Sequence, residues 1–107
     1  MTSSFEIKKE ICEVGHKIYA DGFVAANDGN ISVKVSDNEY YCTPTGVSKG
    51  DLTPDMIIRI DGKGNKIEGR LNPSSDTPTH LELYRRFPDI GGVAHTHSTF
   101  AVSFAQA

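Results

Sequence analysis

A strand, a short turn and a second strand follow one another in residues 30–43, and this stretch constrains the fold most strongly. NISVKV and EYYCT both have the alternation typical of strands, and the residues between them are typical of a turn. Further strand patterns occupy MIIRI (56–60), KIEG (66–69) after a turn at DGKGN, and GVAHTH (92–97).

Two helical segments accompany these strands. A capping-box pattern begins at Ser3, and apolar residues then recur at helical spacing until Gly22, a plausible stop. Thr77, followed by Pro78, marks the start of a second helix that ends before Pro88. The mixture predicts an α/β sandwich with a mostly antiparallel or mixed sheet.

The charge pattern limits the kinds of partner that the chain is expected to bind. The 107 residues carry a formal net charge of −3, with acidic and basic residues mixed. That balance argues against nucleic acid or an anionic membrane. No apolar stretch approaches the roughly 20 residues that cross a bilayer, and the first residues lack the apolar core of a signal peptide. Two isolated cysteines, Cys12 and Cys42, predict reduced thiols, so we expect a cytoplasmic protein.

His95 and His97 stand two positions apart in the last predicted strand. Side chains two apart on a strand share one face and lie about 7 Å from each other along the backbone. Two neutral imidazoles on one face can both reach a single Zn²⁺ at about 2.0–2.1 Å. The alternative is a pair of half-exposed histidines without a ligand, and the pair alone leaves both interpretations open.

Three polar residues, Ser74, Ser75 and Asp76, come directly before the second helix. Hydroxyls and free backbone N–H groups at a helix N-terminus form a potential anion site. The alternative is an ordinary N-cap region, because Ser and Asp are common capping residues. His80, one turn into the helix, is expected to be structural.

Two loops supply further candidates for binding a polar ligand. Gly29 and Asn30 stand at the mouth of a strand, where glycine permits close approach and an amide can donate to a phosphate. Thr45 and Gly46 follow the next strand with hydroxyl and backbone donors. Both segments also have ordinary turn compositions. Nearby Lys49 is expected to be solvated.

Four motifs together resemble the N-terminal half of the class II aldolase/epimerase family, which shares its fold with the non-enzymatic adducin head domain. They are GNIS, TPTG, PSSDTPTHLELYRRFPDIGGVAHTHS and FAVSFAQA. The resemblance implies a three-layer α/β/α fold and a homotetramer with active sites between subunits. It also implies one zinc ion per subunit and a phosphorylated ketose as substrate.

The resemblance assigns roles to residues that match the family motifs. It implies that His95 and His97 ligate zinc and that Asp76 is the catalytic acidic residue beside the metal. The implied phosphate-binding residues are Gly29, Asn30, Thr45, Gly46, Ser74 and Ser75. The third zinc histidine and a catalytic tyrosine belong to the half of the family domain that is absent here, so we expect them beyond residue 107. Residues 1–107 are therefore expected to be the N-terminal part of a single domain, and inactive alone.

The two enzyme branches of the family are not equally well matched. Asp76 stands where the aldolases carry glutamate, which favours the L-ribulose-5-phosphate 4-epimerases. Asp28 and Thr45 favour the aldolases, such as those that release dihydroxyacetone phosphate from L-fuculose 1-phosphate. We therefore expect a zinc-dependent epimerase that acts by retro-aldol cleavage, with the aldolase as the alternative. A non-catalytic, adducin-like module is a third possibility, although loss of the metal should have erased the two histidines.

Overall fold

A five-stranded sheet with two helices forms the part of the chain described by this computed structural model, residues 3–22 and 29–96. The strand order is β4-β3-β2-β1-β5, and every pair is antiparallel. The elements are α1 (Ser4–Ala20), β1 (Asn30–Ser36), β2 (Glu39–Cys42), the 3-10 turns η1 (Lys49–Asp51) and η2 (Pro54–Met56), β3 (Ile58–Asp61), β4 (Lys66–Glu68), α2 (Thr77–Arg86) and β5 (Gly92–His95).

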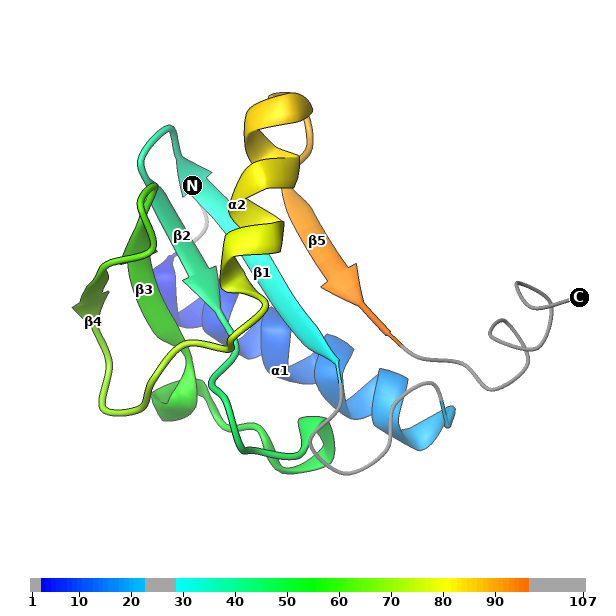
Figure 1. Ribbon diagram of the computed structural model, residues 1–107. Helices are drawn as coiled ribbons and strands as arrows, with labels where there is room; N and C mark the ends of the chain where they lie inside the picture. The colour runs from blue at the N-terminus through cyan, green and yellow to red at the C-terminus, as the bar shows by residue number, and fades with distance from the viewer. Residues whose placement is uncertain (1–2, 23–28, 97–107) are drawn as a thin grey trace, which may run out of the picture.

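The two helices lie on opposite faces of the sheet (Figure 1). Successive strand side chains point to opposite faces, so neighbouring residues of β2 join different cores. Tyr41 packs in the cluster that contains Ile11 of α1, whereas Tyr40 packs with Tyr84 of α2. The expected antiparallel sheet is confirmed, whereas the three-layer arrangement of a whole domain stays a prediction.

Local signals explain where most elements begin and end. Ser3 caps α1, because its hydroxyl accepts a hydrogen bond of 3.1 Å from the backbone N–H of Glu6. Gly22, just after the helix, has a φ of 77°, which glycine adopts without steric cost. The third strand was expected from residue 56 but begins at Ile58, because Pro54 starts a 3-10 turn that runs to Met56.

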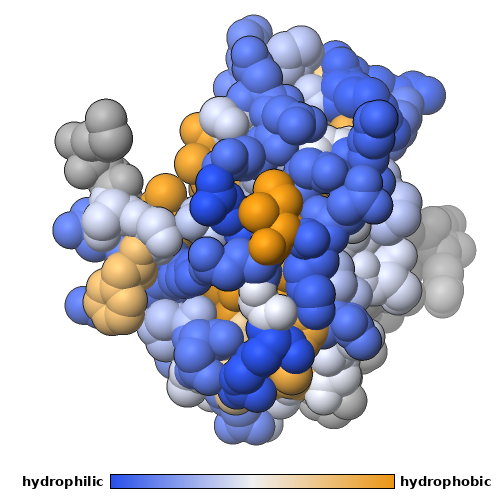
Figure 2. Space-filling view, turned by 90° about the vertical axis from the view of Figure 1, so that its left-hand side faces the viewer, coloured by the Kyte–Doolittle hydropathy of each residue, from blue (hydrophilic) through white to orange (hydrophobic). Residues whose placement is uncertain are grey.

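β4 ends the sheet on one side and is short and charged. Lys66 and Glu68 flank Ile67, which is half exposed. Short edge strands with charged side chains resist pairing with other chains. The face on this side is mostly hydrophilic, with small apolar groups separated by polar ones (Figure 2). Neither helix of the described residues is long and apolar enough to cross a membrane.

Lys49 is buried, which corrects the expectation of a solvated side chain. It is only 2% exposed, and its ammonium group donates a hydrogen bond of 3.3 Å to the carbonyl of Val47. η1 packs against α1 closely enough that a Cβ on Gly15 would lie 3.2 Å from the Lys49 carbonyl oxygen. The apolar stem of a lysine can fill such a site when its charged end finds oxygen acceptors.

Both thiols are free and buried, which leads to a first prediction. Burial raises the pKa of Cys42 to about 12, and burial together with the nearby Asp55 raises that of Cys12 to about 11. The thiolate is the reactive form, so neither cysteine should react at neutral pH while the protein is folded. A disulfide reagent such as dithionitrobenzoate should label both only in denaturant. Rapid labelling of the native protein would contradict this placement.

Candidate functional site

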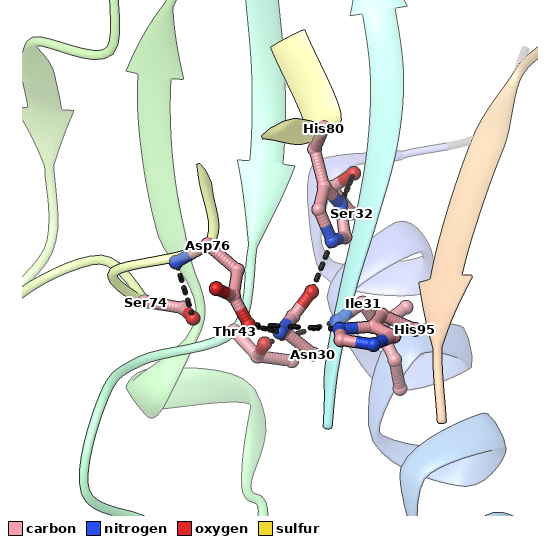
Figure 3. Close-up of polar contacts among 8 residues, drawn as sticks. All are labelled: Asn30, Ile31, Ser32, Thr43, Ser74, Asp76, His80 and His95. Carbon is pink, nitrogen blue, oxygen red and sulfur yellow. Dashed lines mark hydrogen bonds and ion pairs between the residues drawn. The ribbon is translucent and has the colours of Figure 1, made fainter. Parts of the chain in front are cut away.

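His95 and Asp76 are brought together by the pairing of β1 with β5. His95 lies directly opposite Asn30 in this antiparallel pair. The amide nitrogen of Asn30 donates a hydrogen bond of 2.7 Å to Oδ2 of Asp76, and Nδ1 of His95 lies 3.6 Å from the same oxygen (Figure 3). The structure thus unites two of the three expected metal-site residues. The third, His97, lies outside the described residues.

The Asp76–His95 pair is open to solvent and borders a small cavity. The side chain of His95 is 47% exposed and that of Asp76 is 50% exposed. A cavity of about 230 Å³ lies between α2 and β5, beside the pair. It is lined by Asp76, Thr79, His80, Leu83, Val93, Ala94 and His95. A ligand can therefore reach both side chains without displacing the core.

The donor chemistry of this pair fits a zinc ion. An imidazole nitrogen and a carboxylate oxygen are both common zinc ligands. Within residues 3–22 and 29–96, no group of three or more metal-ligating side chains comes together. The described part of the chain therefore offers two suitable donors, fewer than the three protein ligands typical of a catalytic zinc.

Asp76 holds the N-cap position of α2 without acting as a cap. Its side chain makes no capping hydrogen bond. Instead, its own backbone N–H donates to the Ser74 hydroxyl at 3.2 Å, and its carboxylate turns toward Asn30. Of the two interpretations of this segment, ordinary capping therefore does not describe Asp76. The carboxylate is directed into the candidate site.

The loop after β2 lies beside the segment that precedes α2. The backbone N–H of Thr45 donates to the carbonyl of Asn72 at 2.9 Å, and that of Ser74 donates to Thr43 at 3.2 Å. These bonds place Thr45 and Gly46 next to the stretch that carries Ser74 and Ser75. Gly46 has a φ of 77°, and a Cβ there would meet no atom within 4 Å, so its backbone conformation rather than space favours glycine.

The other two expected phosphate residues begin β1. Gly29 has a φ of 84°, which also favours glycine. Asn30 is only 4% exposed, and its side-chain amide already donates one of its two hydrogens to Asp76. The six expected phosphate residues are thus placed in three neighbouring segments, and phosphate binding itself stays a prediction.

His80 lies in the core between α2 and β1, as expected for a structural residue. It is 3% exposed, its Nδ1 lies 2.6 Å from the Ser32 hydroxyl, and its Nε2 contacts the side-chain oxygen of Asn30. Burial lowers the pKa of His80, and neighbouring His95 lowers it further, while Asp76 opposes the shift. Burial also raises the pKa of the Tyr84 hydroxyl, which lies 2.8 Å from Ser32.

Sequence reasoning missed the contacts that join His80 to Asp76 through Asn30. One signal was available, because His80 follows Asp76 by one helical turn and both can then face the same strand. The partner on β1 was not evident, since it depends on how α2 docks on the sheet.

Comparison with known proteins places this geometry in a family context. Residues 9–107 match the family described as Class II Aldolase and Adducin N-terminal domain. Among solved structures, an L-fuculose 1-phosphate aldolase is 31% identical, with a TM-score of 0.87 over 98% of this chain and 50% of that one. YgbL from Escherichia coli, a putative aldolase/epimerase/decarboxylase, is 27% identical, with a TM-score of 0.89 over 95% of this chain and 49% of that one.

A third similar structure is the L-fuculose-1-phosphate aldolase of Thermus thermophilus. It is 29% identical, with a TM-score of 0.74 over 89% of this chain and 48% of that one. The chain therefore spans about half the length of the solved structures that it matches.

Proposed function

The chain belongs to the class II aldolase and adducin N-terminal domain family, and from this premise we propose that it forms half of a zinc-dependent enzyme acting on a ketose phosphate. The reaction begins with retro-aldol cleavage of a C–C bond, after which an aldolase releases the aldehyde, whereas an epimerase re-forms the bond with inverted stereochemistry. One observation carries this proposal. The side chain of Asp76 does not cap α2, and its carboxylate oxygen lies 3.6 Å from Nδ1 of His95 at an open cavity. By complete domain we mean residues 1–107 together with the half expected after them.

Zinc would be held by His95, His97 and Asp76, with a third histidine from beyond residue 107. When bound, zinc would supply a Lewis acid that polarises the carbonyl of the sugar phosphate. Asn30 supports this assignment, because its hydrogen bond to Asp76 keeps one carboxylate oxygen directed toward His95. A ligand that is itself hydrogen-bonded needs less reordering when it binds a metal.

The phosphate of the substrate would lie where the loop after β2 meets the start of α2. Ser74 and Ser75 contribute hydroxyls there, and Thr45 and Gly46 contribute a hydroxyl and backbone donors from the adjacent loop. The backbone bonds between these two segments hold the donors in a fixed arrangement. Gly29 and the second amide hydrogen of Asn30 would complete the site. Binding the phosphate here would position the reacting carbons near Asp76.

Asp76 favours the epimerase over the aldolase. An aldolase must deliver a proton to the carbon left by cleavage, whereas an epimerase must keep that carbon unprotonated until it recaptures the aldehyde. Aspartate is one methylene shorter than glutamate, with about 1.5 Å less reach. A short carboxylate, held back by Asn30, would suppress proton transfer. We therefore propose L-ribulose-5-phosphate 4-epimerase activity.

The aldolase is a second candidate, because an L-fuculose 1-phosphate aldolase is 31% identical to this chain over nearly its whole length. A non-catalytic, adducin-like role is less well supported, since the carboxylate and imidazole of the pair are both present and near each other. We also propose that the complete domain is cytoplasmic and forms a homotetramer with active sites between subunits.

Product analysis of the complete domain, loaded with zinc, tests this proposal. With L-ribulose 5-phosphate we expect D-xylulose 5-phosphate and little free aldehyde. With L-fuculose 1-phosphate we expect little dihydroxyacetone phosphate in a coupled assay. Rapid cleavage without epimerisation would select the aldolase, and no turnover of either substrate would contradict both.

A charge placed at Ser75 should weaken binding of the phosphorylated substrate. Ser75→Asp sets a carboxylate beside the proposed phosphate, so KM should rise at least about tenfold. Zinc content should not change. Ser36→Asp, on the exposed end of β1, is the matched control and should leave KM unaltered. An equal KM in wild type and Ser75→Asp would mean that the phosphate binds elsewhere.

A further inference from the structure

Four buried polar side chains run between α2 and β1 and end at the Asp76 carboxylate. They are Tyr84, Ser32, His80 and Asn30, with exposed fractions between 2% and 4%. Tyr84 is hydrogen-bonded to Ser32. Figure 3 shows the bonds that continue from Ser32 to His80, from His80 to Asn30, and from Asn30, which donates to Asp76. Buried polar groups are costly unless paired, so a chain of this length in the core calls for a reason.

The directions of the bonds nearest Asp76 follow from the chemistry of the groups. An ionised carboxylate only accepts hydrogen bonds, so the NH₂ of Asn30 must face Asp76. The carbonyl oxygen of Asn30 then faces Nε2 of His80. Because that oxygen only accepts, Nε2 must carry the hydrogen.

The directions of the other two hydrogen bonds, between His80 and Ser32 and between Ser32 and Tyr84, follow in the same way. A neutral imidazole with a hydrogen on Nε2 has an acceptor at Nδ1, so the Ser32 hydroxyl donates to it at 2.6 Å. Ser32 has one hydrogen, which this bond uses. The Tyr84 hydroxyl must therefore donate to Ser32 at 2.8 Å. All four hydrogens point toward Asp76.

We propose that His80 is a positioning residue for Asp76, acting through a one-directional hydrogen-bond chain from Tyr84 through Ser32, His80 and Asn30. The chain prevents the Asn30 amide from flipping, because a flipped amide would set its oxygen against the carboxylate and its NH₂ against the N–H of His80. Asp76 is thereby held toward His95 from the core side. The hydrogen-bond directions do not depend on the proposed function, whereas the effect of the chain on zinc binding rests on it.

The tautomer of His80 tests the direction of the chain without zinc or activity. In metal-free complete domain labelled with ¹⁵N-histidine, long-range ¹H–¹⁵N spectra distinguish the two neutral tautomers and the cation. We expect His80 with a hydrogen on Nε2 and none on Nδ1 at pH 7.5. A hydrogen on Nδ1, in either the other tautomer or the cation, would overturn the proposal.

Two buried tyrosines on opposite faces of the sheet provide a matched pair of variants. Tyr84→Phe removes the first donor of the chain, and Tyr41→Phe removes a hydroxyl from the other core. Because hydrogen bonds in a chain polarise one another, Tyr84→Phe should shift the His80 Nδ1 resonance, and Tyr41→Phe should not. Equal effects of both variants, or none, would overturn the coupling.

Variants of His80 test whether the chain positions Asp76. His80→Gln keeps an N–H donor within reach of Asn30, and His80→Met has similar length without one. In metal-free crystals, His80→Met should move the Asp76 carboxylate away from its place near His95, and His80→Gln should preserve it. The zinc dissociation constant should rise about 10- to 100-fold in His80→Met and much less in His80→Gln.

The outcomes separate this inference from the proposed function. An unmoved Asp76 in His80→Met, or equal displacement in both variants, would overturn the positioning role. A wild type that binds no zinc, yet shows the expected tautomer and the expected displacement, would overturn the proposed function and leave the positioning of Asp76 supported.

Discussion

Asp76→Glu is expected to lower epimerisation of L-ribulose 5-phosphate by the complete domain at least about 100-fold. The extra methylene extends the carboxylate by about 1.5 Å, and a displacement of about 1 Å in a reacting group can cost a factor of that size. The longer side chain cannot keep both its 2.7 Å hydrogen bond from Asn30 and its place near His95. Its greater reach should instead promote protonation of the three-carbon fragment, so some dihydroxyacetone and glycolaldehyde phosphate should appear from L-ribulose 5-phosphate.

A control variant separates this effect from a general response to a longer side chain. Asp37 lies in the exposed turn between β1 and β2, far along the sheet from the site, so Asp37→Glu should retain wild-type activity. Steady-state assays of both reactions would check the prediction. Full epimerase activity in Asp76→Glu would show that the length of this carboxylate does not separate the two enzymes.

The joint replacement His95→Ala and His97→Ala is expected to remove zinc from the complete domain. Elemental analysis should fall from about one zinc per subunit to nearly none. Turnover should drop by a factor on the order of 10³ or more, because Lewis-acid stabilisation contributes several kcal/mol. His16, whose ring nitrogen contacts the Leu52 carbonyl at 2.8 Å on the opposite side of the sheet, supplies the control. His16→Ala should keep its zinc, and undiminished zinc in the double variant would contradict the assignment.

The fold was largely predictable because its elements carry local signals. Ser3 predicts the start of α1, and Pro78 predicts the start of α2. The strand-like alternation of residues predicts β1 and β2, so these elements appear where the sequence indicates. Deviations arose where packing decides. β3 starts later than its apolar run because the residues before it close a 3-10 turn, and Lys49 is buried because η1 packs on α1.

The site was predictable only in part. Residue types and motif resemblance predicted Asp76 and His95 as site residues, a role that stays a prediction, and their proximity depends on the register that sets Asn30 opposite His95. The register between two strands that are far apart in the chain is not indicated by any local sequence pattern. The link from His80 to Asp76 was not predictable for the same reason, since it requires a strand residue buried under a helix. His97 lies outside the described residues, so its role stays a prediction.

Anomalous diffraction at the zinc absorption edge tests the central claim most directly. Crystals of the complete domain grown with zinc should show a single strong anomalous peak per subunit. Its expected place is within coordination distance of His95 Nε2 or Nδ1 and of an Asp76 oxygen, at about 2.0–2.2 Å. A peak at any other place, or no peak in zinc-saturated crystals, would contradict the assignment of this pair as the metal centre of a sugar-phosphate enzyme.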